Sequence, residues 1–223
     1  MDLDWNLTPR EAADQQRALA GRVLVQNDFG SIRWVAGVDV GFEQAKTVSR
    51  AAAVILSFPE MQPVESARAR RPVTFPYVPG LLAYRELPAV LDALAQIDHM
   101  PDLILVDGHG LAHPRRFGIA SHLGVLLNCP TIGVAKTVLV GRAEMPEDKV
   151  GAWTPLVDKS ETIGAALRTR VGVSPIHVSI GNRIDLGAAI DFVLRCCKGY
   201  RLPEPTRFAH RAASGEEILL VGV

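Results

Sequence analysis

The sequence has few cysteines and no excess of either charge. Its 223 residues include 3 cysteines, 24 Lys plus Arg and 24 Asp plus Glu. Cys129, Cys196 and Cys197 form neither a Cys-x-x-Cys metal spacing nor a disulfide framework. The balanced charge excludes a bulk field that attracts polyanions, so any nucleic-acid site must be a local basic patch. This argues against an architectural DNA binder that holds its ligand by phosphate contacts alone.

Long apolar runs are also missing. No run approaches the roughly 18 residues that span a bilayer. The first residues, Met-Asp-Leu-Asp, lack the positive region and apolar core of a signal peptide. We therefore expect a soluble, cytoplasmic protein without membrane contact. Hydrophobic residues make up 48% of the chain, which suffices for a sizeable core.

The order of apolar patterns predicts an α/β fold. A helix that Thr8 caps is expected to reach about Val25, and three strands joined by short turns indicate an antiparallel meander. Helices and strands then alternate. For residues 161–169 the sequence allows either a helix or part of a hairpin connection. A meander followed by α-β-α-β is the plan of a ribonuclease H-like domain, with a mixed central sheet flanked by helices, and we expect one domain over 1–223. The predicted strands are 32–40, 51–58, 61–71, 103–106, 131–135, 153–157 and 176–180, and the predicted helices are 82–97, 117–127, 185–197 and a short terminal helix capped by Thr206.

Two aspartates stand out because they belong to strands. Asp107 follows the apolar run Leu103 to Val106, and Asp39 lies within the strand-type run Trp34 to Phe42. In open α/β sheets, ligands bind outside the carboxyl ends of the strands. An isolated Asp-Gly is more often a turn, but two close carboxylates repel unless a cation lies between them. Because Mg²⁺ is bound by carboxylates together with substrate phosphates, the pair raises the hypothesis of a metal-dependent phosphodiesterase.

Four further residues are candidates with a structural alternative of similar or greater weight. Glu86, early in its helix, is a third carboxylate or a solvated helix acid. Lys136 ends a short strand and either neutralises a phosphate or is merely exposed. His210 is an acid–base group or a structural histidine. Tyr77, between two prolines, is either a rigid wedge beside a displaced base or a packed surface ring.

Two rival readings come from other classes of protein. A zinc hydrolase would use His109, His113 and His122, but Gly110 and Pro114 favour a loop over the helix that this spacing requires. A non-catalytic binder of damaged DNA would leave Asp39 and Asp107 beside a phosphate without a metal, and the like charges would repel the ligand.

Seven motifs in order together resemble the endonuclease V family, over about residues 10 to 212. They are Gly-Val-Asp-Val around Asp39, Pro76-Tyr77-Val78-Pro79, Tyr84-Arg85-Glu86, Asp107-Gly108-His109-Gly110, His113-Pro114-Arg115-Arg116, Gly133-Val-Ala-Lys136 and Lys198 to Arg207. The resemblance implies a ribonuclease H-like fold. It also implies a DNA-repair endonuclease that acts at deaminated bases, chiefly inosine, and hydrolyses the second phosphodiester bond on the 3′ side, leaving 3′-hydroxyl and 5′-phosphate ends.

The resemblance also assigns roles to individual residues. It implies Asp39, Asp107 and Glu86 as ligands of Mg²⁺, with Mn²⁺ as a substitute, Lys136 at the phosphate and His210 near the metal and the attacking water. Tyr77 would be the wedge in its loop with Pro76, Val78 and Pro79, and His113 and Arg115 would support strand contacts. Around the base pocket it places Gly80, Leu82, Gly108, Gly110 and Leu139. The implied partner is DNA with deaminated bases, with inosine-containing RNA as a second candidate, and the implied state is a monomer.

Overall fold

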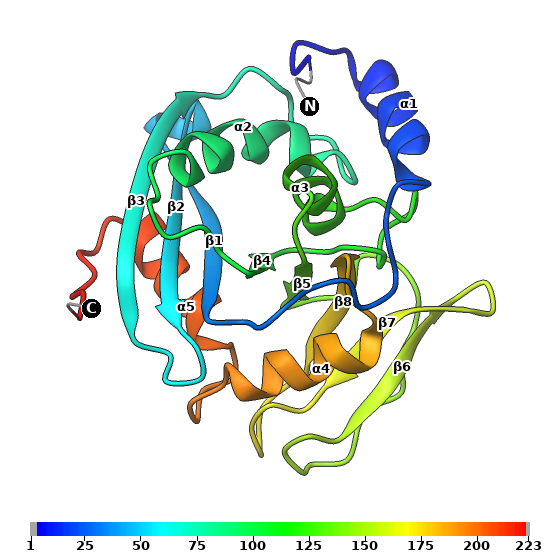
Figure 1. The fold of residues 1–223 in the computed structure, drawn as a ribbon. Helices are drawn as coiled ribbons and strands as arrows, with labels where there is room; N and C mark the ends of the chain where they lie inside the picture. Colours follow the sequence, from blue (N-terminus) through cyan, green and yellow to red (C-terminus); the bar gives the residue numbers. More distant parts are fainter. Residues whose placement is uncertain (1–3, 222–223) are drawn as a thin grey trace.

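The computed structural model describes residues 4–221, and its centre is one eight-stranded sheet in the order β3-β2-β1-β4-β5-β8-β7-β6 (Figure 1). Strands β1, β4 and β5 run parallel, and the other pairs of neighbours are antiparallel. The predicted mixed sheet is confirmed. The strands are β1 (Trp34–Glu43), β2 (Val48–Ser57), β3 (Pro63–Pro72), β4 (Leu103–Asp107), β5 (Thr131–Ala135), β6 (Trp153–Asp158), β7 (Glu161–Leu167) and β8 (Ile176–Asn182).

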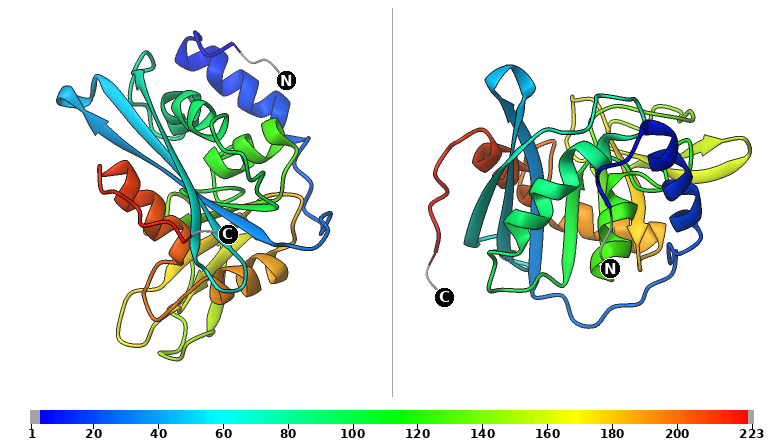
Figure 2. Two further views of the ribbon diagram at one scale, coloured as in Figure 1. Left: turned by 60° about the vertical axis from the view of Figure 1, so that its left-hand side comes forward. Right: turned by 90° about the horizontal axis from the view of Figure 1, so that it is seen from above.

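Helices cover both faces of this sheet. One apolar cluster joins α2 and α3 to the side chains of Ala36, Val38 and Ile104, and the other joins α4 and α5 to Val35 and Leu105. Figures 1 and 2 show the two groups on opposite sides of the sheet, with α1 beside α3. The helices are α1 (Pro9–Ala20), α2 (Leu82–Leu94), α3 (Ile119–Leu127), α4 (Leu186–Arg195), α5 (Glu204–Ala213) and the short 3₁₀ helix η1 (Gln44–Lys46).

Several predicted elements are confirmed in kind and corrected in extent. Strands β1 to β3 form the expected antiparallel meander. Thr8 caps α1 in a capping box with Glu11, but the helix ends at Ala20 rather than near Val25. The open stretch 161–169 contains strand β7, which forms a hairpin with β6.

The predicted cap of the last helix is wrong. Helix α5 begins at Glu204 with Pro203 as its N-cap, so Thr206 lies inside the first turn. Its hydroxyl donates to the carbonyl oxygen of Pro203 at 2.9 Å instead of accepting from the helix. Proline at the start of a helix has no N–H to satisfy and its φ is already helical, so Pro203 and Pro205 set the boundary earlier than Thr206 would.

Helix α5 lies unusually close to strand β1. A Cβ atom on Gly37 would lie 1.8 Å from the carbonyl oxygen of Pro205, and one on Gly41 would lie 2.7 Å from that of Ala213. Side chains alternate along a strand, so Asp39 lies between these glycines on the same face. The absence of two side chains therefore lets the backbone of α5 rest directly on β1, beside Asp39.

Within residues 4–221, no helix combines the length and the apolar character that crossing a membrane requires.

Candidate active site

The two strand aspartates meet at the carboxyl edge of the parallel strands. Strand β1 pairs in parallel with β4, and Val38 lies opposite Val106, so the next residues, Asp39 and Asp107, are neighbours. Helix α5 brings His210 to the same place. One ligand atom from each of Asp39, Asp107 and His210 lies within 4.8 Å of the others. The predicted meeting of the two carboxylates is confirmed.

Glu86 approaches this group from helix α2. Burial and the negative charges of Asp39 and Asp107 raise its pKa to about 8. The pKa of Asp107 is raised as well, by burial and by Asp39, although the ammonium group of Lys136 opposes the shift. These shifts record repulsion among three acids that share a poorly solvated site.

The donor set fits a hard divalent cation. Carboxylate oxygens are the ligands that Mg²⁺ and Mn²⁺ prefer, and a positive ion would relieve the repulsion that keeps the pKa of Glu86 high. Asp39, Asp107 and His210 already lie at a suitable separation for one ion. Glu86 lies outside that group of three, although the charges of Asp39 and Asp107 act on it, so its role as a metal ligand stays a prediction.

Two hydrogen bonds fix the groups around the acids. The Nδ1 atom of His210 lies 2.8 Å from Oδ2 of Asp39, and Nζ of Lys136 lies 2.5 Å from Oδ2 of Asp107. Because a carboxylate only accepts hydrogen bonds, Nδ1 of His210 carries the proton and Nε2 keeps its lone pair when the ring is neutral. Lys136 directly follows β5, as expected, and it pairs with Asp107, which the sequence had not indicated as its partner.

Beside the acids lies a cavity of about 260 Å³ between α2, α3 and the loop after β5. Tyr77, 71% exposed, stands at this cavity. Most of the residues predicted to bind the substrate line it together: Tyr77, Val78, Pro79, Gly80, Leu82, Gly108, His113 and Leu139. The structure thus assembles residues from three separate sequence motifs, together with Gly80, Leu82 and Leu139, into one hollow.

The loop that carries Tyr77 is held at Gly80, which has a φ of +79°. Its carbonyl oxygen accepts from Nε2 of His113 at 2.9 Å and from Nη2 of Arg115 at 2.6 Å. The backbone N–H of Arg115 donates to Nδ1 of His113, which fixes the neutral tautomer. Burial lowers the pKa of His113 to about 4, so the ring stays neutral. His113 and Arg115 therefore brace the pocket loop.

Three residues predicted to bind the substrate are not part of the lining: Arg115, which braces the loop, Pro76 and Gly110. Pro76 precedes the lining part of the loop, and Gly110 packs against β8, where a Cβ atom would lie 1.9 Å from the carbonyl oxygen of Ile180. Gly110 is therefore needed for the close approach of two backbone segments. Its N–H donates to the hydroxyl oxygen of Ser179 at 2.9 Å.

Sequence reasoning missed Gln16 in helix α1, which lines the cavity. Gln16 is 1% exposed, its amide donates to the carbonyl oxygen of Phe117, and its Oε1 accepts from Arg115. The signal was present: Ala12, Gln16 and Leu19 follow helical spacing, which places an amide within the buried stripe. A buried amide needs partners, and here they connect α1 to the pocket brace.

The zinc alternative finds no support in residues 4–221. The ring of His113 is used at Gly80, and His122 lies among the aromatic rings of Trp5, Tyr84 and Phe117. His109 lies instead beside the backbone oxygen of Thr137. The His/Cys/Asp/Glu group suited to a metal in the described chain is that of Asp39, Asp107 and His210.

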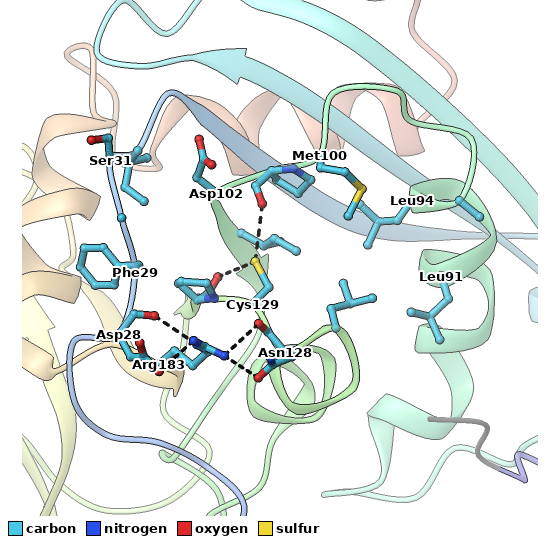
Figure 3. A pocket seen from close by; sticks show the side chains of 17 residues that line it. Asp28, Phe29, Ser31, Leu91, Leu94, Met100, Asp102, Asn128, Cys129 and Arg183 are labelled. Carbon is cyan, nitrogen blue, oxygen red and sulfur yellow. Dashed lines mark hydrogen bonds and ion pairs between the residues drawn. The ribbon is translucent and has the colours of Figure 1, made fainter.

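A larger cavity, about 530 Å³, lies at the opposite, amino ends of β4 and β5 (Figure 3). Polar groups in its lining bond to one another: Arg183 bonds to Asp28 and Asn128, and the thiol of Cys129 donates to the carbonyl oxygen of Pro101. Burial raises the pKa of Cys129 to about 12, so this thiol is not a nucleophile at neutral pH. Size does not identify the reactive site here; the clustered acids do.

Comparison with known proteins gives the class of the protein. The endonuclease V family model matches residues 17–211. Together with the fold and its acidic edge, this match defines a nuclease with a ribonuclease H-like fold, a DNA-repair hydrolase that acts on DNA. Endonuclease V of Trichormus variabilis is 58% identical, over 94% of this chain and 96% of that protein. The chain belongs to the endonuclease V family.

Solved structures agree over nearly the whole chain. Endonuclease V of Streptomyces avermitilis is 44% identical with a TM-score of 0.91, and the match covers 96% of this chain and 95% of that one. Endonuclease V of Ciona intestinalis is 30% identical with a TM-score of 0.82, covering 92% of this chain and 96% of the other. That Ciona structure is a complex with a 24-mer DNA containing an inosine followed by a ribo-adenosine.

Proposed function

We propose that this protein is a Mg²⁺-dependent endonuclease, acting as a monomer, that recognises deaminated bases, chiefly inosine, in DNA. On this proposal it hydrolyses the second phosphodiester bond 3′ to the lesion and leaves 3′-hydroxyl and 5′-phosphate ends. The observation that carries the proposal is the adjacency of two sites: the Asp39–Asp107 pair lies beside the cavity at which Tyr77 stands. The Ciona relative with inosine-containing DNA supports the choice of substrate.

The acids would hold the metal. Asp39 and Asp107, with Glu86 as the third carboxylate, are the proposed ligands of Mg²⁺, with Mn²⁺ as a substitute. When bound, the ion supplies charge stabilisation to the phosphate oxygens as the bond breaks. The ammonium group of Lys136 pairs with the carboxylate of Asp107 in this structure. Because the phosphate is also negatively charged, Lys136 would move to it when the substrate binds.

His210 would take a proton from the attacking water. Asp39 holds its Nδ1–H, so the unprotonated Nε2 is the basic atom of the neutral ring. As the proton passes to Nε2, the water oxygen forms a bond to phosphorus and the bond to the 3′-oxygen breaks. The leaving 3′-oxygen then takes up a proton from solvent. The side chain of His210 is 59% exposed, so it can return its own proton to solvent after each cycle.

Recognition would take place in the cavity. A base must leave the duplex to enter it, and Tyr77 would fill the gap left behind. Deaminated bases pair poorly, so extrusion costs less for them than for normal bases. Glycines at positions 80 and 108 bring backbone rather than side chains to the cavity wall, and a 6-oxo group would be recognised by backbone N–H donors of this wall other than that of Gly108, which donates to the carbonyl oxygen of Val134. Replacing inosine with a purine that lacks the 6-oxygen should abolish cutting; unchanged cutting would refute this mode of recognition.

The test is incision of a duplex with one inosine in Mg²⁺. The unmodified protein should cut the second bond 3′ to inosine, and Asp107→Asn should lose cutting while it keeps lesion binding. Asp191→Asn removes an exposed acid from α4 and should cut normally. Binding without cutting by the unmodified protein would favour the damage binder, and cutting by Asp107→Asn would refute the assigned metal site. Inosine-containing RNA, run in parallel, measures the preference between the two nucleic acids.

A further inference from the structure

Tyr200 has the arrangement of a stacking platform. The guanidinium carbon of Arg207 lies 3.3 Å from the centroid of its ring, so a cation covers one face. Yet 49% of the residue remains exposed. Arg207 is held in turn by Glu204, a 7% exposed residue whose Oε1 accepts from Nη1 of Arg207. An aromatic ring fixed from behind and open in front is suited to binding another flat ring.

The segment around Tyr200 is tied to the catalytic groups. Its neighbour Arg201 donates from Nη2 to the carbonyl oxygen of Lys136 at 3.0 Å and to that of Pro175 at 3.0 Å. Arg207 lies three residues before His210 on α5, so the two side chains occupy the same side of the helix. The segment that carries Tyr200 is therefore anchored through Arg201 to the backbone of Lys136, and the ring of Tyr200 is in contact with Arg207 on the helix of the proposed base.

The platform and the base cavity lie on different sides of the acids. The cavity is lined from α2, α3 and the ends of β4 and β5. Tyr200 packs on α5, which belongs to the opposite face of the sheet. Figures 1 and 2 together show α5 and α2 on opposite sides of the sheet. A strand whose deaminated base is in the cavity and whose scissile phosphate is at the acids would reach α5 if it continued in the same direction.

We propose that Tyr200, backed by Arg207, stacks on the nucleobase immediately 3′ of the bond that is cut. This inference rests on the proposed function, because it needs the strand to cross the acids in that direction. Single-stranded nucleic acid is commonly held by aromatic rings combined with basic side chains, since every base has a face that can stack. Lys198, Arg201, Arg207 and Arg211 supply the basic groups in this stretch.

The remaining tyrosines within the described residues show why Tyr200 is distinctive. Tyr84 is 2% exposed, and its hydroxyl donates to the carbonyl oxygen of Ala12, so it belongs to the core. Tyr77 stands at the base cavity. Tyr200 has neither role, and its exposed ring would gain apolar contact from a stacked base. This contact would be independent of sequence and would position the strand for cleavage.

The first measurement is binding of an inosine-containing strand with 2-aminopurine as the base 3′ of the cut bond. The fluorescence of 2-aminopurine falls when it stacks. All proteins in this assay carry Asp107→Asn so that the strand is not cut. Three of them are compared: one with Tyr200 unchanged, one with Tyr200→Phe and one with Tyr200→Ala. We expect quenching with Tyr and Phe and its loss with Ala, together with about tenfold weaker binding. Trp153→Ala, which removes an equally exposed aromatic (47%) from edge strand β6, should change nothing. Equal quenching with Ala at position 200 would overturn the proposal.

A double-mutant cycle separates stacking from a structural role. The same strand is made with an abasic residue in place of the 2-aminopurine. Removing the base should weaken binding by about tenfold with Tyr200 and leave binding unchanged with Tyr200→Ala; equal losses in both would refute stacking. Incision by the protein with Asp107 intact is measured alongside. If quenching depends on Tyr200 but inosine is not cut, the proposed function fails and the platform stands.

Discussion

Replacing Gly37 with alanine is expected to separate helix α5 from strand β1 and to disable the site at the same time. The added Cβ atom would lie 1.8 Å from the carbonyl oxygen of Pro205 and 2.2 Å from its carbonyl carbon. Both are backbone atoms, so no side-chain rotation relieves the overlap. An ordinary contact begins at 3.4 Å, so α5 must move by about 1.6 Å.

The size of the effect follows from this contact. Overpacking a core by one methyl group typically costs about 1–3 kcal/mol, and a rigid backbone neighbour puts Gly37→Ala at the upper end, about 3 kcal/mol. A shift of about 1.6 Å would also take Nδ1 of His210 and Oδ2 of Asp39 from 2.8 Å beyond the reach of a hydrogen bond. Activity per folded molecule should therefore fall together with stability.

Urea denaturation and inosine incision measure the two effects. With a slope of about 1–3 kcal/mol/M, the unfolding midpoint of Gly37→Ala should fall by about 1 M or more. Gly21→Ala is the matched control, because a Cβ atom there meets nothing within 4 Å and the backbone φ is −68°. That control should be neutral or slightly stabilising. If Gly37→Ala matches Gly21→Ala in both assays, the close packing of α5 does not position the site.

Two further changes test the core and the pocket brace. His122 is fully buried without a hydrogen-bond partner within residues 4–221, and burial lowers its pKa to about 3. Below pH 6.5 His122 is protonated in the unfolded chain but stays neutral in the folded chain, so its cost to folding stability grows as the pH falls. His122→Leu should therefore raise the free energy of unfolding by about 2 kcal/mol more at pH 5 than at pH 8. Urea midpoints that shift equally at both pH values would contradict this. Arg115→Lys keeps the charge but cannot reach Gly80 and Gln16 with the same fork. Affinity for inosine-containing DNA should fall about tenfold while the unfolding midpoint changes little, and an unchanged affinity would remove Arg115 from the brace.

The sequence predicted the parts of the fold that depend on local pattern. Alternating and continuous apolar runs indicated the meander and the parallel strands, because burial on one face or two leaves a readable period. The end of α1 and the start of α5 were missed. The first error arose because apolar residues continue beyond the end of α1. The second arose because Thr206, a residue type that often caps helices, lies one turn inside α5. The hairpin of β6 and β7 stayed open because Glu161 to Thr169 mixes small and β-branched residues.

The site was predictable where residues follow strands and not where side chains meet across the sheet. Asp39 and Asp107 could be brought together because parallel neighbours end at one edge. The pairing of Lys136 with Asp107 and of His210 with Asp39 depends on how α5 and the end of β5 lie in space. Gln16 was overlooked because a helix far from the motifs was assumed to be structural. The resemblance to a family gave expected roles to residues for which the sequence pattern alone left alternatives.

The stretch Gly37-Val-Asp-Val-Gly41 shows how one strand serves two requirements. Its even positions are apolar and pack toward α2 and α3, with Val38 1% exposed. Its odd positions face α5, and two of the three are glycines whose absent side chains admit the backbone of that helix. Asp39 is the remaining odd position, so the helix that approaches most closely is also the one that delivers His210. A larger residue at either glycine would act on the acid between them, although neither glycine has any reactive group. By composition alone this stretch is a buried strand that contains one charged residue. The alternation of its side chains between the two faces of the sheet explains why Asp39 and the two glycines occur together.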